Sequence, residues 1–370
     1  MKIMIMPDSF KGSLSASEAA QAIKQGFETV LPADYHLLPV GDGGEGTLDA
    51  LIRSLDLQIA SREVTGPFGE KANLRYAYRQ QQAFFEMADL VGLPQIPEKQ
   101  RDPLAIQTKG LGEMLVYLAE QGFREIGIGI GGSATVDGGI GFAAGLGYRF
   151  FDQDGKRLQP IGASLTSVAA IDRQHAFELP QELTVKIIND VTNPLCGEQG
   201  AAQIFGPQKG LKETEILSVD QALKQFYQLA NPAILTLEGA GAGGGLAAGI
   251  AAFSNGQIVS GIDYVLDLQE FDQQVQHADL VIVGEGRMDQ QSLSGKAPVG
   301  IARRVPEGIP VVAICGSVAK ELRDTTKSGI DAAFPIVNQP MSLSEAIENA
   351  ESNLIRTSAA IAGLYRRLLE

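Results

Sequence analysis

The sequence has few of the residues that build disulfide frameworks and zinc sites. Its 370 residues include no tryptophan, two cysteines and three histidines. Two cysteines are too few for a disulfide framework, and together with three scattered histidines they do not make a zinc cluster. We therefore expect a protein of the reducing cytoplasm. The residues concerned are Cys196, Cys315, His36, His175 and His277.

An excess of positive charge is also missing. Lys and Arg number 30 against 44 Asp and Glu, which gives a formal net charge of −14. Proteins that neutralise successive nucleic-acid phosphates need clustered Lys and Arg, so we expect no nucleic-acid partner. No apolar run approaches the roughly 20 residues that span a bilayer, and apolar residues 1–6 are too few for a signal-peptide core. We expect no membrane association.

The chain has the length and the patterning of a two-domain α/β protein. At 370 residues it exceeds the size at which one hydrophobic core usually stops growing. Both chain ends alternate strand and helix patterns, which favours a parallel sheet, whereas the middle opens with consecutive strand patterns. We predict a discontinuous α/β domain, residues 1–60 plus 262–370, with residues 61–261 inserted as a second domain.

The periodicity also predicts individual elements. Near the N-terminus these are a strand at 2–6, a helix at 15–30, a strand at 35–40 and a helix at 46–55. Ser15 and Glu18 have the spacing of a capping box. In the middle we expect strands at 59–64, 72–78, 83–87, 125–130 and 184–188, with helices at 111–121 and 211–229. Towards the C-terminus we expect strands at 280–283, 311–314 and 332–336 and one helix at 342–369.

Two loops near the N-terminus follow predicted strands. Residues 8–13 could bind an anion, which would contact the amides of a helix start, the Ser9 and Ser13 hydroxyls and the Lys11 ammonium. A capped helix with a solvated lysine explains the segment equally well. In residues 41–47, four glycines let the backbone approach a ligand. Asp42 and Glu45 offer hard oxygens suited to Mg²⁺ or a substrate hydroxyl.

Two segments of the middle region have similar features. Residues 131–139 have the form of a phosphate cradle without the lysine of a Walker A loop, and Asp137 could hold a metal or accept a proton. The alternative is that this loop only lets a helix pack closely on a sheet. Asp190 closes a β-branched strand and is a candidate general base, while Lys209 lies in a Gly-Pro turn and is a candidate phosphate contact.

Residues 284–296 follow the apolar run 280–283 and precede a helix-prone segment. A strand, glycine loop and helix in that order would bring backbone N–H groups, carboxylates and Lys296 together at the carboxyl edge of a sheet. Such an edge is where α/β proteins bind phosphorylated ligands. The segment therefore favours an enzyme that handles phosphoryl groups.

Residues 239–244 favour a different class of enzyme. Their glycines fit the dinucleotide fingerprint, they follow the apolar run 234–237, and Asp263 lies about 20 residues further on. An NAD-dependent hydroxy-acid dehydrogenase would use such a loop. A non-catalytic sensor of small acids is the other alternative, but several separate acidic and anion-binding loops favour a kinase over both.

Taken together, these segments resemble the bacterial glycerate kinases of the type distinct from both the P-loop and the MOFRL-containing glycerate kinases. The resemblance covers nearly the whole chain, with Val136 as a departure where many members have asparagine. The matching segments are residues 8–13, 41–47, 131–139, 193–200, 206–210, 239–245, 284–296 and 316–318.

The resemblance implies a fold and an activity. The expected fold has a flavodoxin- or Rossmann-like parallel-sheet domain and an inserted mixed α/β domain, with the active site in the cleft between them. The expected reaction is ATP-dependent phosphorylation of D-glycerate with Mg²⁺. Analogy with sugar-acid catabolic enzymes favours 2-phosphoglycerate over 3-phosphoglycerate as product. The oligomeric state stays open, and a homodimer is compatible with the sequence.

Site roles follow from the needs of phosphoryl transfer. Lys11 and Lys296 would contact phosphate or the glycerate carboxylate, and Asp190 would be the base. Asp42 and Asp289 would hold Mg²⁺ or the substrate hydroxyls. The remaining expected binding residues are Asp8, Ser9, Ser13, Gly43, Gly44, Glu45, Gly132, Ser133, Asp137, Lys209, Ser294 and Gly295.

Overall fold

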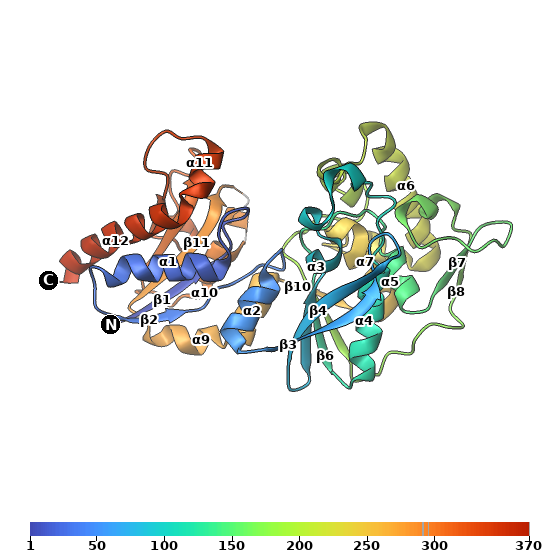
Figure 1. Cartoon of the computed structure of the whole chain (residues 1–370), viewed down its shortest axis with the longest axis horizontal. Coiled ribbons are helices and arrows are strands. Elements are labelled where there is room, and N and C mark those ends of the chain that lie inside the picture. Colours follow the sequence, from blue (N-terminus) through green and yellow to red (C-terminus); the bar gives the residue numbers. More distant parts are fainter. Residues whose placement is uncertain (291, 295, 370) are drawn as a thin grey trace. The chain divides into compact units, whose positions relative to one another are not determined.

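The computed structural model describes residues 1–290, 292–294 and 296–369 (Figure 1). The chain divides into two compact units. The first consists of Met1–Asp42, Asp49–Asp56 and Ser260–Glu370, and the second of Gly43–Leu48 and Leu57–Val259. Residues 43–48 thus pack with the second unit, although the sequence pattern grouped them with the first. Within the described ranges, the structure contains no helix that is both long enough and apolar enough to cross a membrane.

The first unit is built on a five-stranded parallel sheet. Its strands are β1 (Lys2–Pro7), β2 (Asp34–Leu37), β11 (Leu280–Met288), β12 (Val311–Val318) and β13 (Ala332–Pro335). Their spatial order is β13-β12-β11-β1-β2, and every neighbouring pair is parallel. Counted within the unit, this is the flavodoxin order 2-1-3-4-5. The order reverses between β1 and β11, so a crevice at their carboxyl ends is the expected ligand position.

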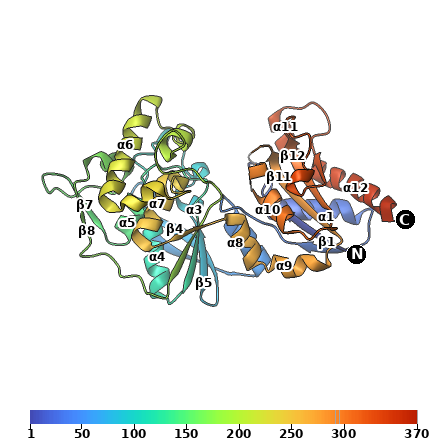
Figure 2. The ribbon, with the colours of Figure 1, turned by 180° about the vertical axis from the view of Figure 1, so that it is seen from behind.

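Helices cover both faces of this sheet because both faces are apolar. Ile3 and Ile5 pack with Ile23 and Phe27 of α1, while Met4 is equally buried on the opposite face. Figures 1 and 2 show α1 and α12 on one side of the sheet and α8 and α10 on the other. The helices of this unit are α1 (Ala16–Glu28), α8 (Gly261–Leu268), α9 (Phe271–Gln274), α10 (Ala297–Arg304), α11 (Leu343–Glu348) and α12 (Ala350–Leu369), and α2 spans Thr47–Leu55.

The second unit has a six-stranded mixed sheet in the order β10-β9-β6-β5-β4-β3. The first four of these strands are parallel, and β4 and β3 continue the sheet as antiparallel neighbours. A separate antiparallel pair, β7 with β8, is visible in green in Figure 1. The strands are β3 (Gln58–Thr65), β4 (Lys71–Arg79), β5 (Gln82–Glu86), β6 (Glu125–Gly129), β7 (Arg149–Phe151), β8 (Ala170–Asp172), β9 (Thr184–Ile188) and β10 (Gln257–Val259).

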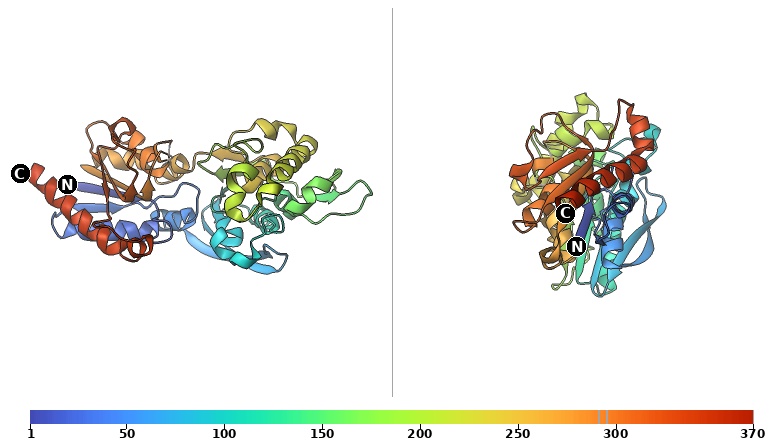
Figure 3. Two further views of the ribbon diagram at one scale, coloured as in Figure 1. Left: turned by 90° about the horizontal axis from the view of Figure 1, so that it is seen from above. Right: turned by 90° about the vertical axis from the view of Figure 1, so that its left-hand side faces the viewer.

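The helices of the second unit pack around one large apolar core. They are α3 (Ala88–Val91), α4 (Lys109–Glu120), α5 (Ile140–Gly145), α6 (Glu213–Ala230) and α7 (Ala242–Ser254). Seen from above, in the left panel of Figure 3, the yellow and green helices of this unit lie beside its blue-green strands. Both units thus carry their loops on regular α/β scaffolds, which is the fold class that the sequence predicted.

Most predicted elements are present, including the capping box in which Ser15 and Glu18 bond each other's backbone. Two predictions were wrong. The predicted helix 342–369 is interrupted at Asn349 between α11 and α12. Residues 284–288 belong to β11 and not to a loop, because they pair with β12 as far as Val318. The apolar run 234–237 overlaps a 3-10 helix, Pro232–Thr236.

The contact between α1 and α12 depends on Gly26. A Cβ atom at this position would lie 2.3 Å from the Ile355 carbonyl oxygen and 2.6 Å from Ser358 Cβ. We expect Gly26→Ala to destabilise the protein by about 1–3 kcal/mol because the two helices must separate. Urea unfolding followed by circular dichroism measures this loss.

Gly363→Ala in α12 is the matched control. A Cβ atom there would meet only Val30 Cγ1, at 3.8 Å. This substitution should be neutral or should stabilise by up to about 1 kcal/mol through helix propensity. Equal unfolding free energies for the two variants would contradict the packing described for α1 and α12.

Candidate functional site

Acidic side chains of the first unit gather beside the end of β1, at the level of Gly284 and Glu285 in β11. Asp8 directly follows β1, and its N–H donates to the Gly284 carbonyl at 2.8 Å. Glu285 is the next residue along β11, so the two carboxyl groups come from neighbouring strands at the same level of the sheet. Asp42 is close enough to affect the pKa of both groups. The acidic cluster formed by Asp8, Asp42 and Glu285 therefore lies at the point where the strand order reverses.

Asp8 holds its proton more tightly than an ordinary aspartate. Burial raises its pKa well above the usual value, and the charges of Asp42 and Glu285 raise it further. Two groups oppose this shift and lower the pKa: the Ser9 N–H, which donates to Asp8 Oδ1 at 2.6 Å, and the charge of Lys296. Burial of two neighbouring carboxyl groups, those of Asp8 and Glu285, favours the protonated form of each.

Glu285 is the site residue that sequence reasoning missed. Its side chain is only 7% exposed, and no described donor bonds its Oε1 atom. Burial raises its pKa to about 7, against the lowering effects of a hydrogen bond with Ser292 and the charge of Lys296. The available signal was a glutamate two residues after the buried run 280–283. It was overlooked because the glycines on either side indicated a loop.

The residues expected to bind an anion near Asp8 are arranged differently from the prediction. The prediction placed them at a helix start, but α1 begins only at Ala16, where Ser15 caps its first turn. The Ser13 hydroxyl donates to the Ile347 carbonyl at 3.0 Å. Lys11 is exposed. The helix-start amides therefore do not surround Lys11, and residues 10–14 form a turn of their own.

The segment that links β11 to α10 contains the other expected residues of this unit. Lys296 is the N-cap residue of α10, and its charge lowers the pKa of both Asp8 and Glu285. Asp289 forms an ion pair with Arg287 at 3.4 Å, and its N–H donates to Ser292 Oγ. The Ser294 side chain and Gly295, both expected to bind ligand, lie outside the described part of the chain.

The carboxylates Asp42 and Asp289 are suited to Mg²⁺ by their chemistry, because this cation prefers hard oxygen ligands. Both charges raise the pKa of Glu285, so both lie within its electrostatic reach. Among the described residues, no group of three or more Asp, Glu, His or Cys side chains is arranged to hold a metal ion. Mg²⁺ at this position would therefore take its remaining oxygen ligands from water or a bound phosphate.

In the second unit, three of the predicted loops meet. The Gly131 N–H donates to the Gly43 carbonyl at 3.0 Å. A Cβ atom at Gly131 would lie 2.5 Å from Gly44 Cα, and one at Gly43 would lie 2.3 Å from the Ile188 carbonyl oxygen. Residues 43–47, 131–139 and the end of β9 are thus in backbone contact that only glycine permits, since Gly43 also has a φ of +90°.

The charged residues of this loop contact have different surroundings. Glu45 is exposed. It lies beside Gly132, because a Cβ atom added at Gly132 would be 3.5 Å from the Cβ atom of Glu45. Glu86, which sequence reasoning also missed, is buried and accepts hydrogen bonds from the Gly46 and Leu48 N–H groups. Glu86 therefore fixes the loop at the start of α2. Asp190 is half-buried and lies two residues after the end of β9.

Asp137 and Lys209, expected to contact ligand, hold loop 131–139 from inside. Asp137 is fully buried and accepts hydrogen bonds from the Thr108 N–H at 2.9 Å, the Thr108 hydroxyl at 2.7 Å and the Gly139 N–H at 2.9 Å. Lys209 donates to Ser133 Oγ at 2.6 Å and to the Thr135 carbonyl at 2.9 Å. Burial lowers the pKa of Lys209 to about 7, although the Asp137 charge raises it.

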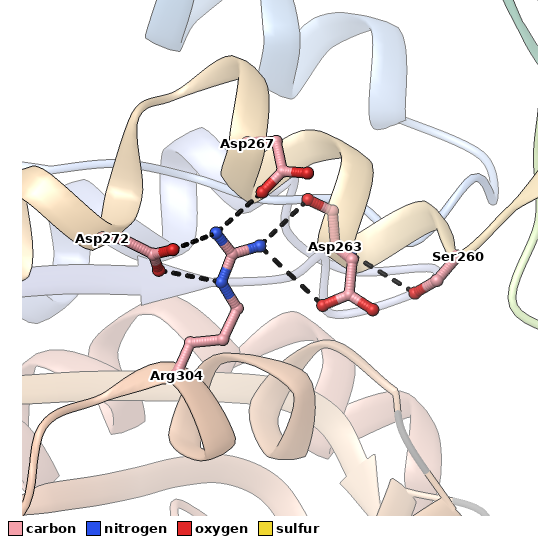
Figure 4. A network of polar contacts seen from close by, with 5 residues as sticks. All are labelled: Ser260, Asp263, Asp267, Asp272 and Arg304. Carbon is pink, nitrogen blue, oxygen red and sulfur yellow. Dashed lines mark hydrogen bonds and ion pairs between the residues drawn. The ribbon is translucent and has the colours of Figure 1, made fainter.

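The glycines of residues 239–244 serve packing in this structure. A Cβ atom at Gly244 would lie 2.0 Å from the Thr135 carbonyl oxygen, so the backbone of α7 packs directly against loop 131–139. Asp263 belongs to the other unit, where it forms an ion pair with Arg304 at 3.8 Å (Figure 4). With no strand before these glycines and Asp263 engaged elsewhere, the dinucleotide fingerprint lacks its structural context.

The position of Glu285 makes stability depend on pH. Its pKa of about 7 exceeds its ordinary value of 4.5, so the folded state binds this proton more tightly than the unfolded state. Burial of the Glu285 charge therefore lowers the free energy of unfolding as the pH rises from 4.5 to 7, and the full decrease is reached above pH 7. We expect Glu285→Gln to raise the free energy of unfolding by on the order of 2–3 kcal/mol near pH 8.

Urea unfolding near pH 8 and near pH 4.5 tests this expectation. The gain should largely disappear at the lower pH, where the carboxyl group is protonated in the folded state and half protonated in the unfolded state. Glu307→Gln, in an exposed turn, is the control and should change stability little at either pH. An equal gain at both pH values would show that burial of charge at Glu285 is not its cause.

Comparisons with known proteins agree along the whole length of the chain. A family model described as the glycerate kinase family matches residues 3–366. A glycerate kinase of Neisseria meningitidis serogroup B is 52% identical over 365 residues, which cover 98% of each chain. A glycerate 2-kinase of Escherichia coli K12 is 40% identical over 370 residues, covering 98% of this chain and 97% of that protein.

A solved structure has the same fold. It is the crystal structure of a candidate glycerate kinase 2 from Salmonella typhimurium LT2, whose sequence is 40% identical to this chain. The TM-score is 0.84, and the match covers 99% of this chain and 98% of the other. With a family model that spans almost all residues and full-length relatives well above 30% identity, the chain belongs to the glycerate kinase family.

Proposed function

We propose that this protein transfers the γ-phosphoryl group of ATP to D-glycerate and forms 2-phosphoglycerate. The observation that carries the proposal is the full-length similarity to proteins named glycerate kinase, one of which is named glycerate 2-kinase. The acidic cluster at the carboxyl edge of a flavodoxin-like sheet supports it, because this edge is where such sheets bind phosphorylated ligands.

Phosphoryl transfer requires cations beside the phosphates and a group that accepts the hydroxyl proton. In this proposal Lys296, whose charge already acts on Asp8 and Glu285, contacts a phosphate or the glycerate carboxylate. The exposed Lys11 has the same role. Asp42 and Asp289 would hold Mg²⁺, which when bound with ATP neutralises charge on the phosphates.

Two carboxyl groups are candidates for the proton acceptor. Asp190 was expected from its position after a strand. Glu285 has a suitable proton affinity, because a pKa of about 7 lets the group accept a proton at neutral pH and hold it. The two assignments make different predictions for single substitutions.

Coupled measurement of ADP release from Mg-ATP with D-glycerate tests the activity. We expect turnover, and NMR of the product should show 2-phosphoglycerate. L-Glycerate and tartronate serve as alternative substrates. If the folded protein turned over none of the three, the proposed kinase activity would be wrong. A change in nicotinamide absorbance without ATP would instead favour the dehydrogenase.

Single substitutions test the assigned roles. Lys296→Ala should lower kcat/KM by about 100-fold or more through loss of charge stabilisation, and Glu285→Gln should lower kcat by a similar factor if this group accepts the proton. Asp190→Ala tests the competing assignment. The control is Lys327→Ala, which should keep full activity because Lys327 is exposed in the segment that precedes β13. Wild-type kcat/KM in both Lys296→Ala and Asp190→Ala, with intact folding, would refute the roles given to these residues.

A further inference from the structure

The second unit contains an open cavity of about 500 Å³ that is lined entirely by residues of this unit. It is bordered by the turn between β3 and β4, the start of α4, and the segment from β7 to residue 161. Its volume is in the range of sites for small organic molecules. None of the residues expected from the sequence to bind ligand lines it. Lining residues include Phe68, Gln107, Lys109, Tyr148, Arg149 and Arg157.

The cavity has positive charge without a compensating acid on its wall. Lys109, Arg149 and Arg157 line it, and no Asp or Glu does. Lys109 is paired with Glu113 at 3.1 Å. The guanidinium groups of Arg149 and Arg157 have no ion pair or hydrogen bond with any described residue. Arg149 is half-buried and Arg157 is exposed, so both guanidinium groups are open to a ligand in the cavity.

The rest of the wall offers both polar and aromatic surface. Gln107 is buried, and α4 begins at Lys109, so the positive end of a 12-residue helix faces this region. Phe68 is 45% exposed on the turn between β3 and β4. Tyr148 is fixed by an edge-to-face contact with Phe253, with ring centroids 4.9 Å apart. The wall thus combines anion-binding groups with rings that an organic molecule can contact.

We infer that this cavity is a binding site for a small phosphorylated organic anion. Planar guanidinium groups match phosphate oxygens with paired hydrogen bonds, and two of them provide for at least two negative charges. A carboxylate ligand without phosphate would satisfy fewer of these donors. The site differs from the one proposed for phosphoryl transfer and does not depend on that proposal.

The position of the cavity connects it with loop 131–139. Gln107 and Lys109 flank Thr108, whose N–H and hydroxyl both donate to Asp137 Oδ2. The Thr108 oxygen also accepts a hydrogen bond from the Phe142 N–H at 2.9 Å. An anion bound at the start of α4 therefore acts one residue away from the contact that fixes this loop.

The absence of tryptophan provides a direct assay. Phe68→Trp places the only tryptophan of the full-length chain at the cavity, on an exposed turn that tolerates substitution. We expect ADP or 3-phosphoglycerate to change its fluorescence with a saturable midpoint below about 1 mM, whereas glycerate should not. The two phosphorylated probes distinguish a nucleotide ligand from a phosphorylated acid.

Charge-removing substitutions in this reporter decide the assignment. Arg149→Gln combined with Arg157→Gln should weaken the midpoint at least tenfold, and Lys156→Gln, exposed on the same segment but outside the cavity, should leave it unchanged. Circular dichroism checks folding, and Arg157→Gln alone replaces the pair if the pair fails to fold. No saturable signal with either probe, or an unchanged midpoint without the arginines, would overturn the inference.

Discussion

Burial of charged groups where parallel strands end is the constraint on which the rest of this structure depends. A carboxyl group without water must be protonated, or must find a cation or hydrogen-bond donors. Asp137 accepts hydrogen bonds from Thr108 and Gly139, which lower its pKa, although burial still raises it. Glu285 has fewer donors, since no described donor bonds its Oε1 atom, and burial raises the pKa of Glu285 and of Asp8. The first arrangement stabilises a loop, and the second leaves proton-binding capacity and negative charge available for ligands.

Glycine makes these arrangements sterically feasible. The loops around residues 43–44 and 131–132 approach each other backbone to backbone, and Gly244 brings α7 onto the Thr135 carbonyl. In β11 and β12, a Cβ atom at Gly316 would lie 2.3 Å from the Gly286 carbonyl oxygen, so the strands can extend together past Glu285 only without side chains there. The glycines in these segments therefore allow backbone to pack directly against backbone.

The sequence predicted those features that depend on neighbouring residues. The Ser15 capping box, most strands and helices, and the α/β class follow from local periodicity, and the family resemblance indicated a flavodoxin- or Rossmann-like sheet. Features that depend on pairing across the fold were missed. Glycines around Glu285 indicated a loop because only the register with β12 shows that they belong to a strand. Likewise, nothing local indicates that Lys209 meets Ser133, 76 residues away.

The most direct test of the account is the titration of carboxyl carbons by ¹³C NMR in protein labelled at Asp and Glu. The account predicts one glutamate resonance with a midpoint near 7 that disappears in Glu285→Gln, and an aspartate resonance, from Asp8, that titrates well above the usual aspartate range. Ordinary midpoints for every aspartate and glutamate would show that the cluster is solvated and compensated, and would contradict the central claim.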